Sequence, residues 1–196
     1  MALEPTFRPA TLADAAALAV LADIAANGLA NRVWLDQAGP GRSALEVGRQ
    51  SVRRPEEVDS YCNATIAMVG PEVAGCLIGG LPEDLYDVSR LDEKADVFRP
   101  VARLAVQAAG TWYIDVIASF AEFRGYGLGS KLLAVAASKA EETGAAGNSL
   151  VVGSWNAGAE RLYRRCGFVP VAREPAILPD AYPQSGDWIL MQRPPT

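Results

Sequence analysis

Hydrophobic positions along the first half of the chain follow a helical pattern and then a strand pattern. Apolar residues recur at helical spacing over residues 12–26 and, more weakly, over residues 43–52, which predicts two helices. Two apolar and β-branched segments, residues 65–69 and 73–78, are separated by a Gly-Pro pair. A turn-forming pair between two such segments predicts an antiparallel hairpin.

The second half of the chain alternates between strands and helices. Residues 81–109 are charged at first and apolar later, with Pro100 near the start of the apolar part and Gly110 just after it. Proline in the first turn and glycine past the last one are typical of a helix, so this segment is predicted to be a helical insertion. The other predicted elements are strands at 6–9, 111–117, 150–152, 169–172 and 188–191 and helices at 128–143 and 157–166.

Length and charge narrow the class of protein. A chain of 196 residues, 50% of them hydrophobic, is long enough for one sizeable core, so a single domain over residues 1–196 is expected. With 18 Lys and Arg against 23 Asp and Glu, a net charge of −5 and no long basic run, nucleic acid is not expected as a partner. The N-terminus lacks a signal-peptide pattern and no apolar run reaches membrane-spanning length, so we expect a cytoplasmic protein without a membrane partner.

The chain contains no histidine, which removes the usual general base and the commonest metal ligand. Mechanisms built on Ser-His-Asp or Cys-His are therefore excluded, and proton transfer falls to Asp, Glu, Tyr, Cys, Lys, the backbone or water. The three cysteines, Cys62, Cys76 and Cys166, have neither CxxC nor zinc-site spacing. We therefore predict free thiols, no disulfide and no bound metal.

A glycine-rich segment stands where the strand at 111–117 gives way to the helix at 128–143. Its sequence, FRGYGLG over residues 123–129, leaves backbone N–H groups unblocked at a helix start, where the helix dipole also favours an anion. Glycine lets the backbone approach such an anion closely, and Arg124 adds positive charge. A pyrophosphate would suit this segment, and a tight turn without a ligand is the structural alternative.

Two other phosphate-binding motifs fail on the same residues. The dinucleotide fingerprint GxGxxG requires a third glycine where this chain has Ser130, and no acidic residue ends a strand about 20 residues later. A P-loop requires Gly-Lys followed by Ser or Thr, whereas the order here is Gly129, Ser130, Lys131. A nucleotide-binding oxidoreductase is therefore disfavoured.

The glycine-rich segment is one of a series of motifs in the second half of the chain. In order, these are Ile-Ala-Ser at 117–119, Glu-Phe-Arg-Gly-Tyr-Gly-Leu-Gly at 122–129, Asn156, Leu-Tyr at 162–163 and Gly-Phe at 167–168. The series resembles the GNAT superfamily of acetyl-CoA-dependent N-acetyltransferases. The resemblance is strong over residues 111–171 and only topological before them.

The resemblance implies how coenzyme A binds. In that family the RxxGxG turn holds the pyrophosphate, which assigns Gly125 to Ser130 as its cradle. The backbone of Ile117 and Ser119 would pair with pantetheine, and Asn156 would bind the coenzyme arm. The residues implied in coenzyme binding are Ile117, Ala118, Ser119, Arg124, Gly125, Tyr126, Gly127, Leu128, Gly129, Ser130 and Asn156.

The same resemblance assigns Tyr163 to the departing thiolate of coenzyme A, as its acid or as a hydrogen-bond donor. A packed core tyrosine is the alternative. The base is less defined, because some family members carry a glutamate where this chain has Val151. Alternation along the strand before the turn puts Asp115 on the face that looks toward the acceptor in related enzymes. Asp115 is therefore the candidate base, with pairing to an arginine or binding of the amine alone as alternatives, and Glu122 is a poorer candidate.

The expected fold is a single-domain α/β fold with a mixed, twisted sheet of about six or seven strands and helices on both faces. The expected activity is direct transfer of acetyl from acetyl-CoA to a primary amine, without a metal. The expected partner is a small-molecule or peptide amine. A noncatalytic acyl-CoA-binding or regulatory module is the alternative, and the sequence leaves the acceptor and a homodimer open.

Overall fold

The computed structural model describes residues 4–85, 89, 91, 94–180 and 182–194. Part of the predicted insertion, namely residues 86–88, 90 and 92–93, lies outside the described residues. The chain divides into two units, Met1–Gly79 with Asp115–Leu132 and Gly80–Ile114 with Leu133–Thr196, and each unit is described by itself. The single domain expected from the chain length stays a prediction.

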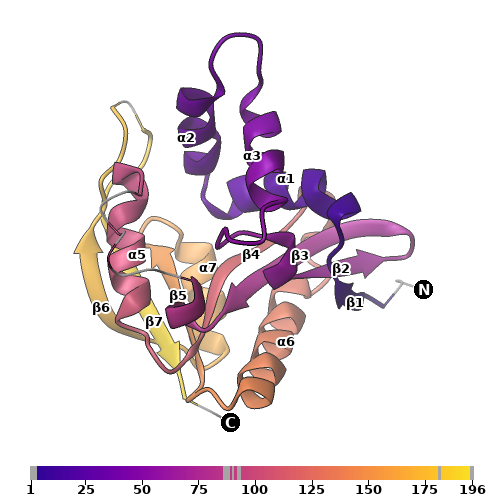
Figure 1. The fold of residues 1–196 in the computed structure, drawn as a ribbon. Coiled ribbons are helices and arrows are strands. Elements are labelled where there is room, and N and C mark those ends of the chain that lie inside the picture. Colours follow the sequence, from indigo (N-terminus) through magenta and orange to yellow (C-terminus); the bar gives the residue numbers. More distant parts are fainter. Residues whose placement is uncertain (1–3, 86–88, 90, 92–93, 181, 195–196) are drawn as a thin grey trace. The chain divides into compact units, whose positions relative to one another are not determined.

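A mixed β-sheet of seven strands is the central element of the fold. The strands are β1 Thr6–Pro9, β2 Ala64–Val69, β3 Glu72–Gly80, β4 Trp112–Ser119, β5 Asn148–Gly153, β6 Val169–Pro175 and β7 Asp187–Arg193. Their order in the sheet is β1-β2-β3-β4-β5-β7-β6 (Figure 1). β4 pairs with β5 in parallel, whereas β2 pairs antiparallel with β1 and β3, and β7 pairs antiparallel with β5 and β6. The α/β class and the mixed sheet confirm the prediction.

The first unit combines the N-terminal strands with three helices. The helices are α1 Ala15–Ala25, α2 Leu29–Ala38 and α3 Ala44–Val52. β2 and β3 form the predicted hairpin, in which Ala64 lies opposite Ile78. Gly70 has a φ of 59° in its turn, a left-handed conformation that glycine adopts without a steric cost. The largest fully buried side chains of this unit are Leu18, Leu21, Leu29, Ile66, Leu77, Ile78 and Leu132.

Helix α2 is the one helix of the first unit that the sequence did not predict. Its buried residues Leu29, Ala30, Trp34 and Ala38 recur at helical spacing, whereas Leu35 lies on the other side of the helix and is 55% exposed. What stabilises α2 is contact with α3, beside which it lies in Figure 1. The Trp34 ring packs so closely on Gly48 of α3 that a Cβ atom there would lie 2.6 Å from it. The apolar face of α2 is therefore buried against α3.

The second unit contains the insertion helices and the last strands. Its helices are α4 Pro82–Leu85, α5 Arg99–Val106 and α7 Ala157–Arg165, and α6 Leu128–Thr143 runs from the first unit into the second. Pro100 lies in the first turn of α5, and α6 has the bounds that the sequence predicted. The largest fully buried side chains of this unit are Leu104, Tyr113, Leu133, Leu150 and Phe168. None of the helices described is both long and apolar enough to cross a membrane.

An ion pair between the partly exposed Arg8 and the buried Asp14 connects β1 to the start of the first helical segment. Two nitrogens of Arg8 donate to the two carboxylate oxygens of Asp14 at 2.8 and 2.7 Å, and the N–H of Thr11 donates to Asp14 at 2.7 Å. The hydrogen bonds from Arg8, more than any other cause, lower the pKa of Asp14 to about 2. A carboxyl group whose pKa is lower in the folded protein than in the unfolded chain stabilises the folded state at pH values above the unfolded-state pKa. This stabilisation is lost as the pH falls through the folded-state pKa.

We expect Asp14→Asn to lower the free energy of unfolding by about 2 kcal/mol at pH 7. The loss should shrink as the pH falls from about 4 to about 2, because the wild-type carboxyl then becomes neutral as well. Urea denaturation at several pH values measures both effects. Glu46→Gln, at the exposed carboxylate that caps α3, is the control and should cost less. An Asp14→Asn penalty that does not depend on pH would contradict the ion-pair explanation.

Candidate functional site

The glycine-rich turn is the best-defined part of the site and lies in the first unit. β4 ends at Ser119, the short 3₁₀ turn Ala121–Phe123 follows, and α6 begins at Leu128. Phe123 and Leu128 are buried, so they anchor the turn at both ends. Gly125 and Gly127 have φ values of 88° and 72°, a region that glycine occupies more easily than any other residue. The backbone conformation therefore favours glycine at these two positions whether or not a ligand binds.

The same turn leaves a row of backbone donors unpaired. Within the described part of the chain, no hydrogen bond is donated by the backbone N–H groups of Gly125, Gly127, Leu128, Gly129 and Ser130. The first intrachain bond of α6 comes only at Lys131, whose N–H donates to the Gly127 carbonyl at 3.1 Å. Unpaired N–H groups at a helix start form an anion-binding site. The geometry thus fits the pyrophosphate cradle that the sequence predicted, although no ligand contact tests it.

The surroundings of the turn are open and positively charged on one side. No protein atom lies within 4 Å of the position that a Cβ atom would take on Gly125 or Gly127, so a ligand can reach the backbone. Arg124 is exposed and forms no ion pair with the described residues. Lys131, by contrast, is paired with Glu4. Arg124 is therefore the side chain of this turn that is available to a phosphate.

Strand β4 carries the predicted pantetheine and base residues in the first unit. Asp115, Ile117 and Ser119 are half-buried and alternate with buried Val116 and Ala118. This alternation confirms that Asp115, Ile117 and Ser119 share one face of the strand. Their contacts with a ligand stay a prediction.

A close strand contact fixes the end of β4. Any side chain at Gly75 of β3 would collide with the carbonyl oxygen of Ala118. The Phe120 N–H donates to the Ala74 carbonyl at 3.0 Å. These contacts hold the Ala118 backbone rigidly beside β3, which is what a group that polarises a carbonyl needs.

Asn156 has a structural task at the start of α7 in the second unit. Its Oδ1 atom accepts a hydrogen bond from the Ala159 N–H at 3.2 Å, which makes it the N-cap of the helix. Its own N–H donates to the Gly153 carbonyl at 2.8 Å. The side-chain amide donates no hydrogen bond in the part of the second unit that the structure describes, so it can still donate to a ligand. Its predicted role in coenzyme binding is compatible with the cap.

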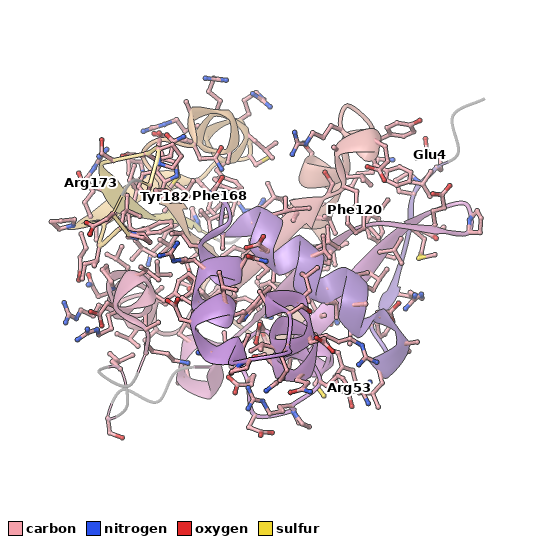
Figure 2. All side chains as sticks on the ribbon, turned by 90° about the horizontal axis from the view of Figure 1, so that it is seen from above. Glu4, Arg53, Phe120, Phe168, Arg173 and Tyr182 are labelled. Carbon is pink, nitrogen blue, oxygen red and sulfur yellow. The ribbon has the colours of Figure 1, made fainter. Side chains whose placement is uncertain are left out.

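Tyr163 lies on the buried face of α7. It is 7% exposed, and its ring packs against the ring of Phe168 (labelled in Figure 2), with the two ring centroids 6.0 Å apart. The guanidinium of Arg193 lies over the Phe168 ring, 5.4 Å from its centroid, and donates a hydrogen bond to the Asn148 Oδ1 atom at 2.8 Å. The Phe168 ring, which packs behind Tyr163, is therefore held in place. The Tyr163 hydroxyl makes no hydrogen bond to the described residues and is not among the fully buried unpaired polar atoms. Its proton is therefore not used by another group among the described residues.

Burial determines the protonation state of Tyr163. Removal from water raises the pKa of its hydroxyl to about 12, because burial disfavours the charged form. The hydroxyl therefore stays protonated at all ordinary pH values and can donate a hydrogen bond. A tyrosine with this pKa is suited to stabilise a thiolate rather than to act as a base.

Two tryptophans, Trp155 just after β5 and Trp188 in β7, form a pair in the second unit. The rings of Trp155 and Trp188 meet edge to face at 4.8 Å, and Gly153 leaves room for the Trp155 ring because a side chain there would collide with it. Both indole N–H groups are buried and find no partner among the described residues. The interpretation of Trp155 as part of a coenzyme cleft stays a prediction.

Sequence reasoning missed Asp59, which precedes β2 in the first unit. The residue is half-buried, and its carboxylate accepts a hydrogen bond from the Ser51 hydroxyl at 3.4 Å. Burial raises the pKa of Asp59 to about 6, and the negative charges of Asp115 and Glu57 add to the effect. In the sequence, Asp59 belongs to an acidic stretch that has the composition of a solvated loop, so no local signal distinguishes it.

The candidate residues are divided between the two units. Asp115, the β4 backbone and the glycine turn lie in the first, and Asn156 and Tyr163 lie in the second. Among the residues that the structure describes, no three Cys, Asp or Glu side chains lie together in a way that could hold a metal ion. The first unit presents an anion-binding turn and a half-buried carboxylate, and the second unit presents a protonated tyrosine.

Comparison with known proteins identifies the family. The model of the acetyltransferase (GNAT) family matches residues 42–168, and the chain belongs to this family. No curated protein matches the chain.

Solved structures share the fold. The crystal structure of an acetyltransferase matches this chain with a TM-score of 0.67 and 23% sequence identity. The match covers 97% of this chain and 100% of the acetyltransferase chain. An N-acetyltransferase from Staphylococcus aureus Mu50 has a TM-score of 0.66 at 20% identity, with coverage of 95% and 99%. A chain of the NatC complex bound to Gag peptide and CoA has a TM-score of 0.55 at 18% identity, with coverage of 99% and 100%.

Proposed function

We propose that this acetyltransferase moves the acetyl group of acetyl-CoA directly to a primary amine. The observation that carries the proposal is the row of unpaired N–H groups from Gly125 to Ser130 at the start of α6, which matches the charge and shape of a pyrophosphate. Two structures of the same fold support the choice of reaction. One is of an N-acetyltransferase and the other is of a complex with a peptide and CoA.

The chain offers one group for each step of direct transfer. The amine nitrogen attacks the thioester carbon, the N–C bond forms, and the backbone N–H near Ala118 polarises the carbonyl oxygen. Asp115 takes the proton that the amine loses. The C–S bond breaks, and the protonated Tyr163 hydroxyl donates a hydrogen bond or its proton to the thiolate. In this scheme no acetyl-enzyme forms and no metal takes part.

An amine panel tests the proposal. Acetyl-CoA is incubated with the protein and ethylamine, spermidine, lysine or a tripeptide with a free N-terminus, and free coenzyme A and acetylated product are measured by mass spectrometry. We expect product with at least one amine and none with ethanol or with the N-acetylated tripeptide. Acetylation of alcohols alone would contradict the proposal. Coenzyme A binding without transfer to any acceptor would favour the noncatalytic module instead.

Asp115→Asn tests the base. The amide cannot accept the amine proton, so turnover should fall by about 10²-fold and the dependence of turnover on pH should weaken. Coenzyme A affinity, measured by calorimetry, should stay nearly unchanged. Glu122→Gln, at an exposed carboxylate of the same segment, is the control and should keep the wild-type rate. If turnover falls but its pH profile keeps its shape, Asp115 binds the amine without taking its proton.

A further inference from the structure

The first turn of α6 carries a lysine above the glycine-rich turn. The Lys131 N–H donates to the Gly127 carbonyl at 3.1 Å, so Lys131 lies one helical turn after Gly127 and on the same side of the helix. The Cα–Cβ bonds of a helix are tilted toward its N-terminus. The Lys131 side chain therefore leaves its Cα atom in the direction of the glycine-rich turn, over a residue that has no side chain of its own.

A carboxylate from the N-terminal segment occupies this lysine. The Lys131 Nζ atom donates to the Oε2 atom of Glu4 (labelled in Figure 2), and both residues belong to the first unit. Glu4 is followed by Pro5, which favours an extended backbone at Glu4. β1 then pairs with β2 from Thr6 onward. The strand pairing therefore limits how far Glu4 can move from the start of α6.

The ion pair between Glu4 and Lys131 lies at the surface. The Glu4 side chain is 85% exposed and the Lys131 side chain is 40% exposed. An exposed ion pair contributes little free energy, because water solvates both groups well when they separate. A phosphate group that binds Lys131 can therefore displace Glu4 at a small cost.

Lys131 is the cation that α6 places beside the unpaired N–H groups of the turn. The helix contains two lysines and no arginine. The second lysine, Lys139, lies two turns later and is paired with Glu142 at 2.8 Å. Glu4 thus neutralises the only positive side chain in the first turn of α6, and it adds a negative charge close to a site that suits an anion.

We propose that Lys131 is a further phosphate-binding residue of the coenzyme site and that Glu4 competes with coenzyme A for it. The proposal rests on the proposed function, since that function assigns the glycine-rich turn to coenzyme A. On binding, Lys131 exchanges the Glu4 carboxylate for a phosphate of the coenzyme, which is the pyrophosphate or the 3′-phosphate of the ribose. Glu4 lowers the affinity in two ways, because it holds Lys131 and because it repels the phosphate.

Glu4→Gln tests the competition. The amide keeps the size of the side chain and loses its charge, so coenzyme A affinity measured by calorimetry at low ionic strength should rise about two- to five-fold. The increase should shrink at high salt, because salt screens exposed charges. Glu142→Gln is the matched control, since it breaks the exposed ion pair with Lys139 on the same helix, and it should leave the affinity unchanged. Unchanged or lower affinity in Glu4→Gln overturns the competition.

Lys131→Met tests the phosphate contact. Methionine keeps most of the aliphatic side chain, so the protein should stay folded while coenzyme A affinity falls several-fold. Lys139→Met is the control and should bind normally. Dephospho-coenzyme A, which lacks the 3′-phosphate, identifies the phosphate: an equal loss for both ligands assigns Lys131 to the pyrophosphate, and a loss for coenzyme A alone assigns it to the 3′-phosphate. Undiminished affinity for both ligands in a folded Lys131→Met protein overturns the proposal.

The double variant separates direct competition from a general effect of charge. If Glu4 acts by occupying Lys131, then Glu4→Gln should raise the affinity much less in the Lys131→Met background than in the wild type, because the two substitutions affect one interaction. An equal increase in both backgrounds would show that Glu4 acts only through its charge at a distance, which contradicts the competition.

The same titrations distinguish a failure of this proposal from a failure of the proposed function, because none of them needs an acceptor amine. Coenzyme A binding that depends on Lys131, in a protein that acetylates no amine, supports this proposal and contradicts the proposed function. Wild-type binding that neither Glu4→Gln nor Lys131→Met changes overturns this proposal alone. Absence of coenzyme A binding in the wild type overturns both.

Discussion

Replacement of Tyr163 by Phe is expected to slow a single turnover of acetyl transfer by about 10²-fold or more while coenzyme A affinity changes little. The hydroxyl is protonated, because burial raises the pKa of Tyr163 to about 12. Phenylalanine keeps the ring that packs on Phe168, so only the donor to the developing thiolate is lost. The fold and the melting temperature should therefore be retained.

The measurement is a rapid-quench single turnover beside a coenzyme A titration of the same sample. Single-turnover conditions are needed because slow product release can hide the chemical step in the steady state. Tyr61→Phe, at a half-buried tyrosine outside the predicted site, is the control. A wild-type single-turnover rate for Tyr163→Phe, with a lower melting temperature, would show that Tyr163 is a packing residue.

Gly127→Glu is expected to abolish coenzyme A binding and leave the protein folded. The new carboxylate would stand among the unpaired N–H groups of the turn and repel a pyrophosphate. No protein atom lies within 4 Å of the new Cβ position, so the substitution creates no steric clash in the protein. The backbone strain at a φ of 72° costs roughly 1 kcal/mol, which is too little to unfold the chain.

The chain provides a matched control for this substitution. Gly144, just after α6, has a φ of 70° and is also free of neighbours within 4 Å. Gly144→Glu therefore adds the same strain and the same charge away from the turn. Calorimetry should detect no coenzyme A binding to Gly127→Glu and normal binding to Gly144→Glu. Undiminished affinity in a folded Gly127→Glu protein would remove the pyrophosphate assignment.

Much of the fold could be predicted because the signals are local. The periodicity of residues 128–143, the Gly-Pro turn before β3 and Gly167 after α7 each specify an element boundary within a few residues. α2 was missed, although its buried residues Leu29, Ala30, Trp34 and Ala38 recur at helical spacing. What the sequence does not indicate is which segment covers this face, namely α3, where Gly48 leaves room for the Trp34 ring.

The same distinction applies to the site. The glycine turn and the Asn156 cap are made by neighbouring residues, and their conformations follow from the sequence around them. The raised pKa of Asp59 arises because the fold buries its carboxyl group, although the surrounding sequence has the composition of a solvated loop. Burial of this kind cannot be read from the local sequence, which is why Asp59 was missed.

The close contact between Gly75 and the Ala118 carbonyl has a consequence for variation of the sequence. Even alanine at position 75 would push the end of β4 away from β3, because its methyl group and the carbonyl oxygen would occupy the same space. The orientation of the peptide unit between Ala118 and Ser119, and with it the direction in which the Ser119 N–H points, is thus set from the neighbouring strand. Position 75 accordingly admits one amino acid for reasons of backbone geometry, and this restriction would hold even if Gly75 never came near a substrate.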